Sequence, residues 1–343
     1  MTVFFVDFVN GLDANNGLGP DASHASNKPW KTIGKLLGAA GLASGDTAYL
    51  SPSGPFREAV TGAMTSAVAE TKILGDPANA QGFKTSGGVL VTPGDVIWTA
   101  YVTNDKTAPS ASATLYLAGR DYLTFENIIF VSSSTRLVDA VNTANSNNIT
   151  FRRCAFLQGS GATGRIMDVL GVADVAMNWT LDTCIVMCND ASGSIYFASP
   201  AGSAADYDLN IQIKHCHFVG GDNTAIRLDG AATNKPGGLD IYNCTFLCGA
   251  GFRVATGIST TIPCTIYYCY INVGCTGLLA TAAGEILEEN NIIFASTPRT
   301  NVTAGSGSIS NGTYSNMFEI GQWILNGKLP RPFGTPMANS PLL

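Results

Sequence analysis

The strongest constraint on the fold of this chain is an eight-residue phrase that recurs along the sequence. The clearest copy is LDIYNCTF, Leu239 to Phe246, in which the first, third, sixth and eighth residues are apolar. Further copies begin at Leu123, Ile149, Trp179, Ile211, Cys264 and Leu287. Successive starts lie 23 to 32 residues apart. A drifting period of this size is typical of a solenoid, in which each repeat packs on its neighbours.

Each half of the phrase alternates apolar and polar residues, as in a strand with one buried face. The alternation changes phase between the third and sixth residues, which predicts a turn from one sheet into the next. When the copies are aligned, the sixth position reads Ile128, Cys154, Cys184, Cys216, Cys244, Cys269 and Ile292. Coils stacked about 4.8 Å apart need such columns of like residues to fill one core. The sequence therefore predicts an all-β parallel β-helix of about ten coils.

The chain divides into three predicted parts. Residues 1–60 form an N-terminal strand and a helix that caps the solenoid, residues 61–295 form the parallel β-helix, and residues 296–343 form a C-terminal cap and an irregular, Pro-rich tail. The capping helix has an apolar face made by Ile33, Leu36, Leu37 and Ala40. Residues 317–326 are a candidate cap for the far end, and the tail is expected to lie on its own body or on a neighbouring subunit.

Composition argues against several classes of function. The net charge is −6, with 19 Lys and Arg spread along the chain, so nucleic acid is not an expected partner. No apolar run approaches the ~20 residues of a membrane helix, so membrane insertion is not expected, and the first residues lack the basic start of a signal peptide. Five of the nine cysteines fall in the inward sixth column, which predicts free thiols made in a reducing compartment. No metal site and no cofactor are expected.

The opening of the chain carries a second pattern. A Val-Asp…Gly-x-Asp…Asn-Gly-Leu…Pro…Lys-Thr-Ile line precedes a Gly-Asp-Thr-x-Tyr-Leu strand and an Arg-Glu pair. The residues that make it are Val6, Asp7, Gly11, Asp13, Asn16, Gly17, Leu18, Pro20, Lys31, Thr32, Ile33, Gly45 to Tyr49, Arg57 and Glu58. This pattern resembles the start of right-handed, single-stranded parallel β-helix proteins of the pectin-lyase-like superfamily. The resemblance implies that architecture, but not one activity, because the superfamily includes lyases, hydrolases, phage tailspikes and non-catalytic virion proteins.

The outward fourth position of the phrase alternates in charge. It reads Glu126, Arg152, Asp182 and Lys214 in consecutive coils. We expect an ion-pair ladder, which is either a carbohydrate-binding strip or plain surface complementarity. His215 and His217 are expected to point outward from one strand, with no carboxylate nearby to complete a metal site. They extend the candidate carbohydrate surface or contact another subunit.

Two copies of an Arg-x-x-Asp pattern provide the best catalytic candidates. Arg136 with Asp139 and Arg165 with Asp168 should stack in adjacent coils. Two carboxylates about 5 Å apart resemble the pair in a retaining glycosidase, and the alternative is an Arg/Asp network bonded only to itself. The Asn-Thr-Asp, Asp-Asp, Gly-His-Gly and Arg-Ile-Lys motifs of polygalacturonase-like members are absent from the sequence. Asn148, Asn178 and Asn210 precede successive phrases and predict a ladder of stacked turn amides.

These features favour a structural bacteriophage virion protein, a capsid-decorating or tail or spike accessory subunit. It would present a rigid surface for assembly or for adhesion to host glycans. The expected partners are other virion subunits or further copies of this chain, a homotrimer included, and host surface polysaccharide. The expected location is the virion, after synthesis in the host cytoplasm. A polysaccharide lyase or glycoside hydrolase and a non-catalytic glycan-binding module are the alternatives.

Overall fold

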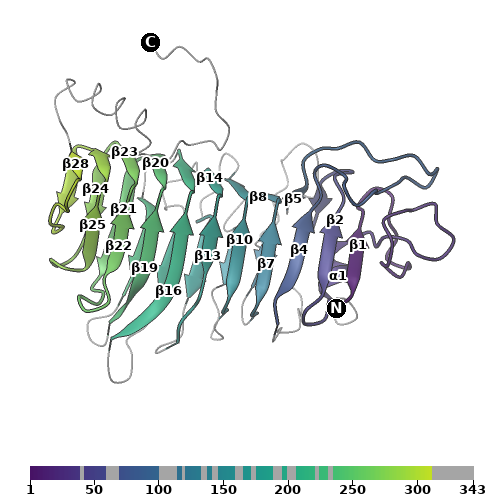
Figure 1. Cartoon of the computed structure of the whole chain (residues 1–343), viewed down its shortest axis with the longest axis horizontal. Helices are drawn as coiled ribbons and strands as arrows, with labels where there is room; N and C mark the ends of the chain where they lie inside the picture. The colour runs from purple at the N-terminus through teal and green to yellow at the C-terminus, as the bar shows by residue number, and fades with distance from the viewer. Residues whose placement is uncertain are drawn as a thin grey trace, which may run out of the picture.

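A computed structural model of the chain describes residues 1–38, 42–58, 69–99, 114–117, 120–132, 137–140, 146–158, 165–170, 175–187, 195–198, 206–220, 224–230 and 235–310. Regular structure there is almost entirely strand, arranged in three sheets that run along an elongated molecule (Figure 1). Every pairing between these strands is parallel, and each pairing joins one coil to the next, which is the arrangement of a parallel β-helix. The predicted fold class is confirmed.

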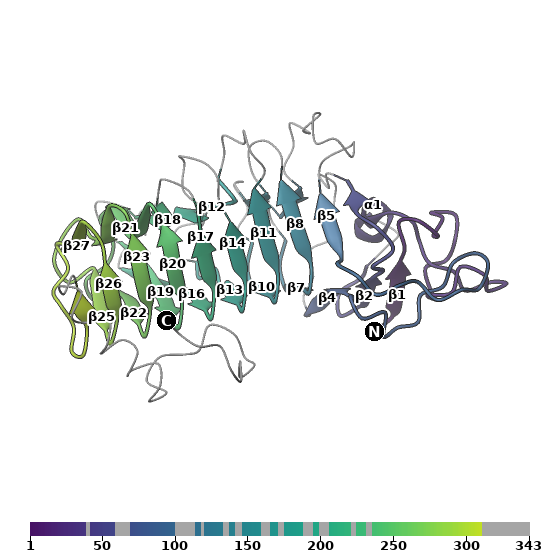
Figure 2. The same cartoon turned by 90° about the horizontal axis from the view of Figure 1, so that it is seen from above.

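The first sheet holds ten strands. They are β1 (Val3–Val6), β2 (Thr47–Leu50), β4 (Thr71–Gly75), β7 (Leu123–Glu126), β10 (Ile149–Arg152), β13 (Thr180–Asp182), β16 (Tyr207–Lys214), β19 (Pro236–Tyr242), β22 (Cys264–Tyr267) and β25 (Ile286–Glu289). The second sheet faces the viewer in Figure 2 and also holds ten strands. They are β3 (Phe56–Arg57), β5 (Ile97–Thr99), β8 (Ile129–Ser132), β11 (Ala155–Gln158), β14 (Ile185–Met187), β17 (His217–Val219), β20 (Thr245–Cys248), β23 (Tyr270–Val273), β26 (Ile292–Phe294) and β28 (Ile309–Ser310).

The third sheet holds eight strands. They are β6 (Leu115–Tyr116), β9 (Val138–Ala140), β12 (Met167–Leu170), β15 (Ile195–Ala198), β18 (Thr224–Asp229), β21 (Ala250–Thr256), β24 (Thr276–Leu279) and β27 (Thr297–Thr300). Each complete coil gives one strand to each sheet, so the described residues form eight complete coils, with partial coils at both ends. This count is smaller than the ten predicted. The strands β27 and β28 extend the described solenoid beyond residue 295.

The core follows the predicted columns. Phe125 pairs with Phe151, and Phe151 with Leu181, in the first sheet, while Phe130 stacks on Phe156 with 5.3 Å between ring centroids. The sixth column is an unbroken row of buried thiols: Cys154, Cys184, Cys216, Cys244 and Cys269. Each of these thiols lies 3.5 to 3.8 Å from a backbone carbonyl of the preceding coil. Burial raises the pKa of Cys154 to about 12, so this row is part of the packing.

The prediction placed the start of the last copy of the phrase one residue too late, at Leu287. Cys264 pairs with Ile286, and Ile271 with Ile293, so the copy starts at Ile286. Its sixth position is therefore the buried Asn291, whose Nδ2 donates to the carbonyl of Ile266 at 2.8 Å. The error arose because Glu288 points inward, where the pattern expects an apolar side chain. Its carboxylate pairs there with Arg299 at 2.7 Å.

The short helix α1 (Ile33–Leu37) lies in the N-terminal part of the chain and contacts β1. Its buried residues are Ile33, Leu36 and Leu37, while Ala40 and the candidate cap at 317–326 lie outside the described residues. Thr32 caps the helix by accepting a hydrogen bond from Lys35 N. In the described part of the chain, no helix has the length and hydropathy needed to span a bilayer.

Candidate functional site

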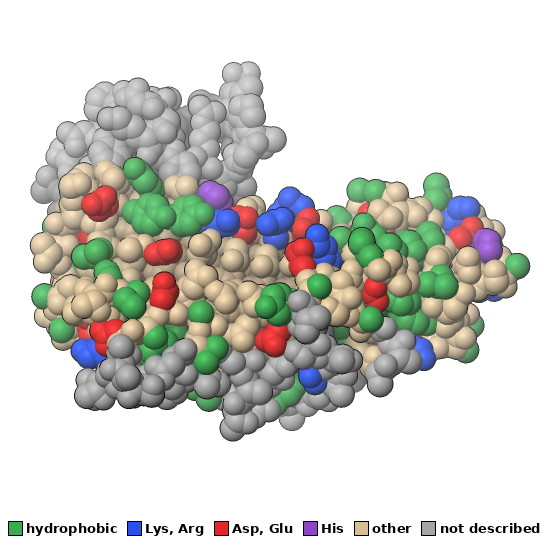
Figure 3. Space-filling model, turned by 60° about the horizontal axis from the view of Figure 1, so that its bottom comes forward, with side chains coloured by type: hydrophobic (Ala, Val, Ile, Leu, Met, Phe, Trp, Pro, Cys, Tyr) green, Lys and Arg blue, Asp and Glu red, His purple; other side chains and the backbone are tan. Residues whose placement is uncertain are grey.

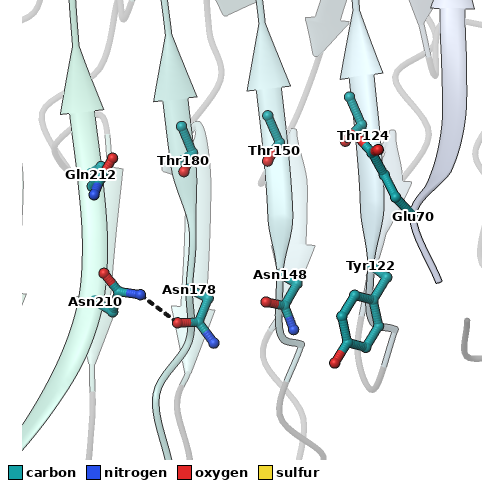
Figure 4. Close-up of a pocket in the computed structure, with 9 residues that line it drawn as sticks. All are labelled: Glu70, Tyr122, Thr124, Asn148, Thr150, Asn178, Thr180, Asn210 and Gln212. Atoms are coloured by element: carbon teal, nitrogen blue, oxygen red, sulfur yellow. Dashed lines mark hydrogen bonds between the residues drawn. The ribbon is translucent and has the colours of Figure 1, made fainter. Parts of the chain in front are cut away.

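An open groove of 430 Å³ lies on the outer face of the first sheet. Two rows of side chains run across its strands (Figure 4). The first row contains Tyr122, Asn148 and Asn178, which stand one or two residues before their strands, and Asn210, which lies within β16. The second row stands two residues further along and contains Thr124, Thr150, Thr180 and Gln212. Glu70 closes one end of the groove, and it is the one ionised side chain in the lining.

The first row depends on an unusual backbone. Tyr122, Asn148, Asn178 and Asn210 all have φ between 51° and 57°. Asn tolerates this left-handed conformation better than most residues do, which explains why the turn repeats Asn. The Nδ2 of Asn210 donates to the Oδ1 of Asn178 at 2.5 Å. This bond confirms the predicted amide ladder for these two rungs.

The second row presents hydroxyl and amide groups at the spacing of the coils. Parallel pairing places Thr124, Thr150 and Thr180 in consecutive rungs, and Gln212 in the next. Thr124 donates to Glu70 at 2.9 Å, and Glu70 also pairs with Lys72 at 3.2 Å. Within the described residues, the side chains of Thr150, Thr180 and Gln212 make no hydrogen bond. Their polar groups therefore face the groove with capacity for a ligand.

The chemistry of this lining fits an extended neutral ligand that is rich in hydroxyl groups. Side-chain amides and hydroxyls both donate and accept hydrogen bonds, so they match either end of a ligand O–H. Tyr122 is 40% exposed at the end of the first row, where its ring offers an apolar face with a polar tip. A phosphate or a polyanion would find no cation in this lining.

Beside the groove, the charged side chains of the fourth phrase position form ion pairs. Asp182 lies 3.7 Å from both Arg152 and Lys214. This confirms the predicted ladder for these three residues. Glu126, however, pairs with Arg153 of the following turn rather than with Arg152. Figure 3 shows these charges gathered beside a largely uncharged surface.

The Asp182 carboxylate is the centre of this charged group. Burial alone would raise its pKa, but hydrogen bonds from His215 and Thr183 and the charge of Lys214 outweigh burial and lower the pKa. A carboxylate held this way stays ionised, and its single negative charge faces the two cations Arg152 and Lys214. Surface complementarity among these side chains accounts for the geometry of the ladder.

The two histidines do not share a strand, contrary to the prediction. His215 lies in the turn between β16 and β17 with φ of 55°, while His217 begins β17 in the second sheet. The left-handed turn residue redirects the chain between the two sheets. The prediction also missed a carboxylate, because the Nδ1 of His215 lies 3.2 Å from Asp182. In the described part of the chain, no group of three His, Cys, Asp or Glu residues could hold a metal ion.

The predicted catalytic aspartates do stack on the third sheet. Asp139 and Asp168 occupy the same register position in β9 and β12. The Asp168 side chain is 7% exposed and pairs with Arg165 at 3.2 Å. Arg136, the fourth predicted member, lies outside the described residues.

A tyrosine that the sequence reading missed joins this patch to the next coil. The Arg165 guanidinium lies 3.5 Å from the ring centre of Tyr196, and Tyr196 donates to Asp229 at 2.6 Å. Arg227 pairs with Asp229 at 2.9 Å. Burial and the bond to Asp229 raise the pKa of Tyr196 to about 12. The patch is thus a connected network of Arg, Asp and Tyr.

The groove itself was not predicted as a binding site. The prediction placed the candidate carbohydrate strip on the charged fourth position, whereas the groove lies over the second position and the preceding turn. One signal was present in the sequence, because three consecutive copies of the phrase, at Leu123, Ile149 and Trp179, carry Thr at the second position. Glu70 and Tyr122 had no comparable signal, since neither belongs to a repeated column of its own residue type.

Comparisons with known proteins support the fold and leave the activity open. The sequence matches no family model. A lacto-N-biosidase of Bifidobacterium longum subsp. longum is 25% identical over 205 residues, which are 57% of this chain but only 12% of that protein. This chain therefore spans a small part of that relative.

Two solved structures share the architecture. Pectate lyase Pel9A superposes with a TM-score of 0.58 at 12% identity, covering 91% of this chain and 78% of that chain. XylC, solved in complex with xylose, superposes with a TM-score of 0.54 at 9% identity, covering 87% and 70%. With the three parallel sheets and the stacked columns, these likenesses show that the chain has the pectin-lyase-like parallel β-helix fold.

Proposed function

We propose that this chain is a carbohydrate-binding β-helix and that the groove on its first sheet is the glycan contact. The observation that carries the proposal is the pair of neutral polar rows, Asn over Asn and Thr over Thr, repeated at the spacing of the coils. A polymer of sugar units that runs along the solenoid axis would meet the same donors and acceptors at each rung.

Known relatives favour the same class of ligand. The names of the proteins that resemble this chain refer to lacto-N-biose, pectate and xylose. The groove differs from an acidic-polysaccharide site in its lack of cations, because its one ionised residue, Glu70, is negative. We therefore expect neutral glycans to bind more tightly than polyuronates.

The test is a glycan array followed by calorimetry with the tightest neutral oligosaccharide. Changing Thr150 and Thr180 together to Val keeps the shape of both side chains and removes two hydroxyls from the groove. Each lost hydrogen bond is worth about 1 kcal/mol, so affinity should fall about 10- to 30-fold. Thr245→Val is the matched control, since Thr245 faces outward from the second sheet. Failure of the wild-type protein to bind any neutral glycan would contradict the proposal.

We propose that this binding serves adhesion by a bacteriophage particle, with the chain as a structural subunit on the capsid or tail. The support is the row of free, buried thiols, which suits synthesis in a reducing cytoplasm, together with a ligand class that is found on cell surfaces. Mass spectrometry of particles purified from the lysed host should find this chain in constant ratio to the capsid protein. Its presence only in the particle-free supernatant would contradict this setting.

A glycoside hydrolase or polysaccharide lyase is the second candidate, and the stacked Asp139 and Asp168 favour it. Pairing in adjacent parallel strands, which lie about 4.8 Å apart, would bring the two carboxylates to a separation similar to that of a retaining glycosidase pair. If these residues are catalytic, changing both to Asn should abolish release of reducing sugar or unsaturated uronate from a protein that still folds. Cleavage that persists in the double variant would exclude both residues as catalysts.

A further inference from the structure

The second sheet turns an apolar face outward. On β8, β11, β14, β17 and β20, the side chains that point away from the core are mainly aliphatic. The aliphatic ones are Ile129, Val131, Ala155, Leu157, Ile185, Met187, Val219 and Leu247, and the other two outward residues in these columns are His217 and Thr245. No Asp, Glu, Lys or Arg stands among the outward residues of these five described strands. We call this surface the aliphatic face.

Three large apolar side chains of the aliphatic face are exposed to solvent. Ile185, Met187 and Leu247 are 39%, 44% and 43% exposed. Figure 2 looks onto this sheet, and no described strand or helix lies across it. A contiguous apolar surface of this kind on a water-soluble protein marks a contact with something else.

The last described strand of the chain belongs to the same sheet as the aliphatic face. β28 is the last described strand, and it forms the end of the same sheet, five strand spacings from β14. Those five spacings amount to about 24 Å. The 33 residues from 311 to 343 follow directly, and an extended chain of that length can reach about 110 Å. The aliphatic face therefore lies well within reach of this C-terminal segment.

The composition of the segment matches the face. Residues 311–343 contain three charged side chains: Glu319, Lys328 and Arg331. Their large apolar side chains are Met317, Phe318, Ile320, Trp323, Ile324, Leu325, Leu329, Phe333, Met337, Leu342 and Leu343. Four prolines after residue 328 restrict regular structure and favour an extended course over a flat surface.

We propose that the C-terminal segment 311–343 packs on the aliphatic face of the same chain. Apolar side chains of the segment cover Ile185, Met187 and Leu247, and they remove both surfaces from water. The segment thereby acts as a strap along the second sheet, on the side away from the third sheet's Arg/Asp/Tyr network.

Limited trypsin digestion of the full chain tests this contact. Lys328 is the one tryptic site in the segment, because Pro332 blocks cleavage after Arg331. Cleavage requires the segment to leave the face, so its rate reports the open population. Ile185→Asp and Met187→Asp place a carboxylate in the contact, and each should speed cleavage after Lys328 about tenfold or more. Leu287→Asp is the matched control, since Leu287 is 52% exposed on the outer face of the first sheet, and its rate should equal that of the wild type.

The results of this digestion distinguish a contact made by the segment of the same chain from a contact made by a second copy. Equal cleavage rates in the wild type and in both face variants overturn the proposal. Protection that disappears on dilution, as light scattering shows dimers or trimers dissociating, also overturns it, because a second copy would then be the occupant. Met187→Gln adds polarity without charge, so it should speed cleavage after Lys328 less than Met187→Asp does. If the circular dichroism of this variant equals that of the wild type, the faster cleavage reflects loss of the contact rather than unfolding of the β-helix.

Discussion

At the scale of single residues, the left-handed turn between the first and second sheets is the most demanding position in each coil. Asn127, Arg153, Thr183, His215 and Asn243 occupy it in consecutive coils, with φ between 50° and 58°. Asn adopts this conformation at low cost, but a β-branched residue adopts it at higher cost. Thr183 is therefore under strain that its Asn counterparts avoid.

Replacing Thr183 with Asn should stabilise the protein. Relief of the strained φ of 58° should raise the free energy of unfolding by about 1 kcal/mol, measured by urea denaturation. The hydrogen bond from Thr183 to Asp182 can be replaced by the amide of Asn. The reciprocal change, Asn243→Thr, should destabilise by a similar amount. If both variants shift stability in the same direction, strain is not the cause.

A second residue-scale prediction concerns Asp182 and pH. Burial would raise the pKa of this carboxyl, but its hydrogen bonds and Lys214 outweigh burial and lower the pKa below the usual Asp value of 3.8. The folded pKa lies below the unfolded one, so the stabilisation is present above pH 3.8 and is lost as pH falls through the folded value.

Asp182→Asn should consequently be less stable than the wild type at pH 6, and the difference should narrow below pH 4. Thermal unfolding of both proteins from pH 6 to pH 3 measures this. Asp240→Asn provides a control carboxylate, because Asp240 belongs to the same sheet but stands at the second position of its phrase, whereas Asp182 stands at the fourth. If the difference in stability between Asp182→Asn and the wild type increases as the pH falls, the ionised carboxylate is not stabilised by its neighbours.

At the scale of elements, the strands could be predicted because alternating apolar and polar residues in the sequence indicate which side chains are buried. The phrase at Ile149 matches β10 and β11, and the phrase at Leu123 matches β7 and β8. A period-two pattern fixes which side chains face the core, and columns of like residues fix which strands stack. Both depend on local composition, so a single sequence suffices.

The site was harder to predict because it depends on turns. Nothing in the pattern shows that His215 leaves its strand, since Arg, Thr, His and Asn all occupy that turn in different coils. The partner of Glu126 changed for the same reason, because Arg153 in the turn reaches it. The buried pair of Glu288 and Arg299 was invisible as well, since the two residues are 11 positions apart and meet only when the last coil closes.

The capping helix α1 gives an element-scale prediction. The Glu58 carboxylate accepts hydrogen bonds from Ile33 N at 2.6 Å and Gly34 N at 2.8 Å, at the start of the helix. Glu58→Ala should leave these amides without their partner and destabilise the N-terminal cap by about 1 to 2 kcal/mol. Glu58→Gln keeps one acceptor and should cost less. Chemical denaturation of the three proteins gives the ranking, and an Ala variant as stable as the wild type would contradict it.

At the scale of the whole molecule, stability is expected to be transmitted only between neighbouring coils. Each strand pairs with the strands before and after it in its sheet, and the core is one continuous row of side chains. In such a molecule a defect weakens its own coil and the adjacent one, while distant coils keep their stability. The position of a change along the rod therefore decides which segments respond to it.

The polar layer at the C-terminal end tests this behaviour. The Glu288 side chain is fully buried and holds Arg299, Asn291, Ser308 and the amide of Gly305. Burial alone would raise the pKa of Glu288, but these bonds lower it. Glu288→Ala would leave the 11% exposed Arg299 guanidinium without its counter-charge, and breaking a buried pair in this way costs about 3 to 5 kcal/mol.

Hydrogen exchange with mass spectrometry should show which strands are destabilised by the loss of this pair. We expect faster exchange in β25 to β28 of the Glu288→Ala variant and unchanged protection in β7 to β13. Changing Glu288 and Arg299 together to Met removes both charges, and it should restore part of the protection because no unpaired charge remains. Uniformly faster exchange along the whole rod would mean that the solenoid unfolds as one cooperative unit, contrary to the coil-by-coil behaviour that its pairing pattern predicts.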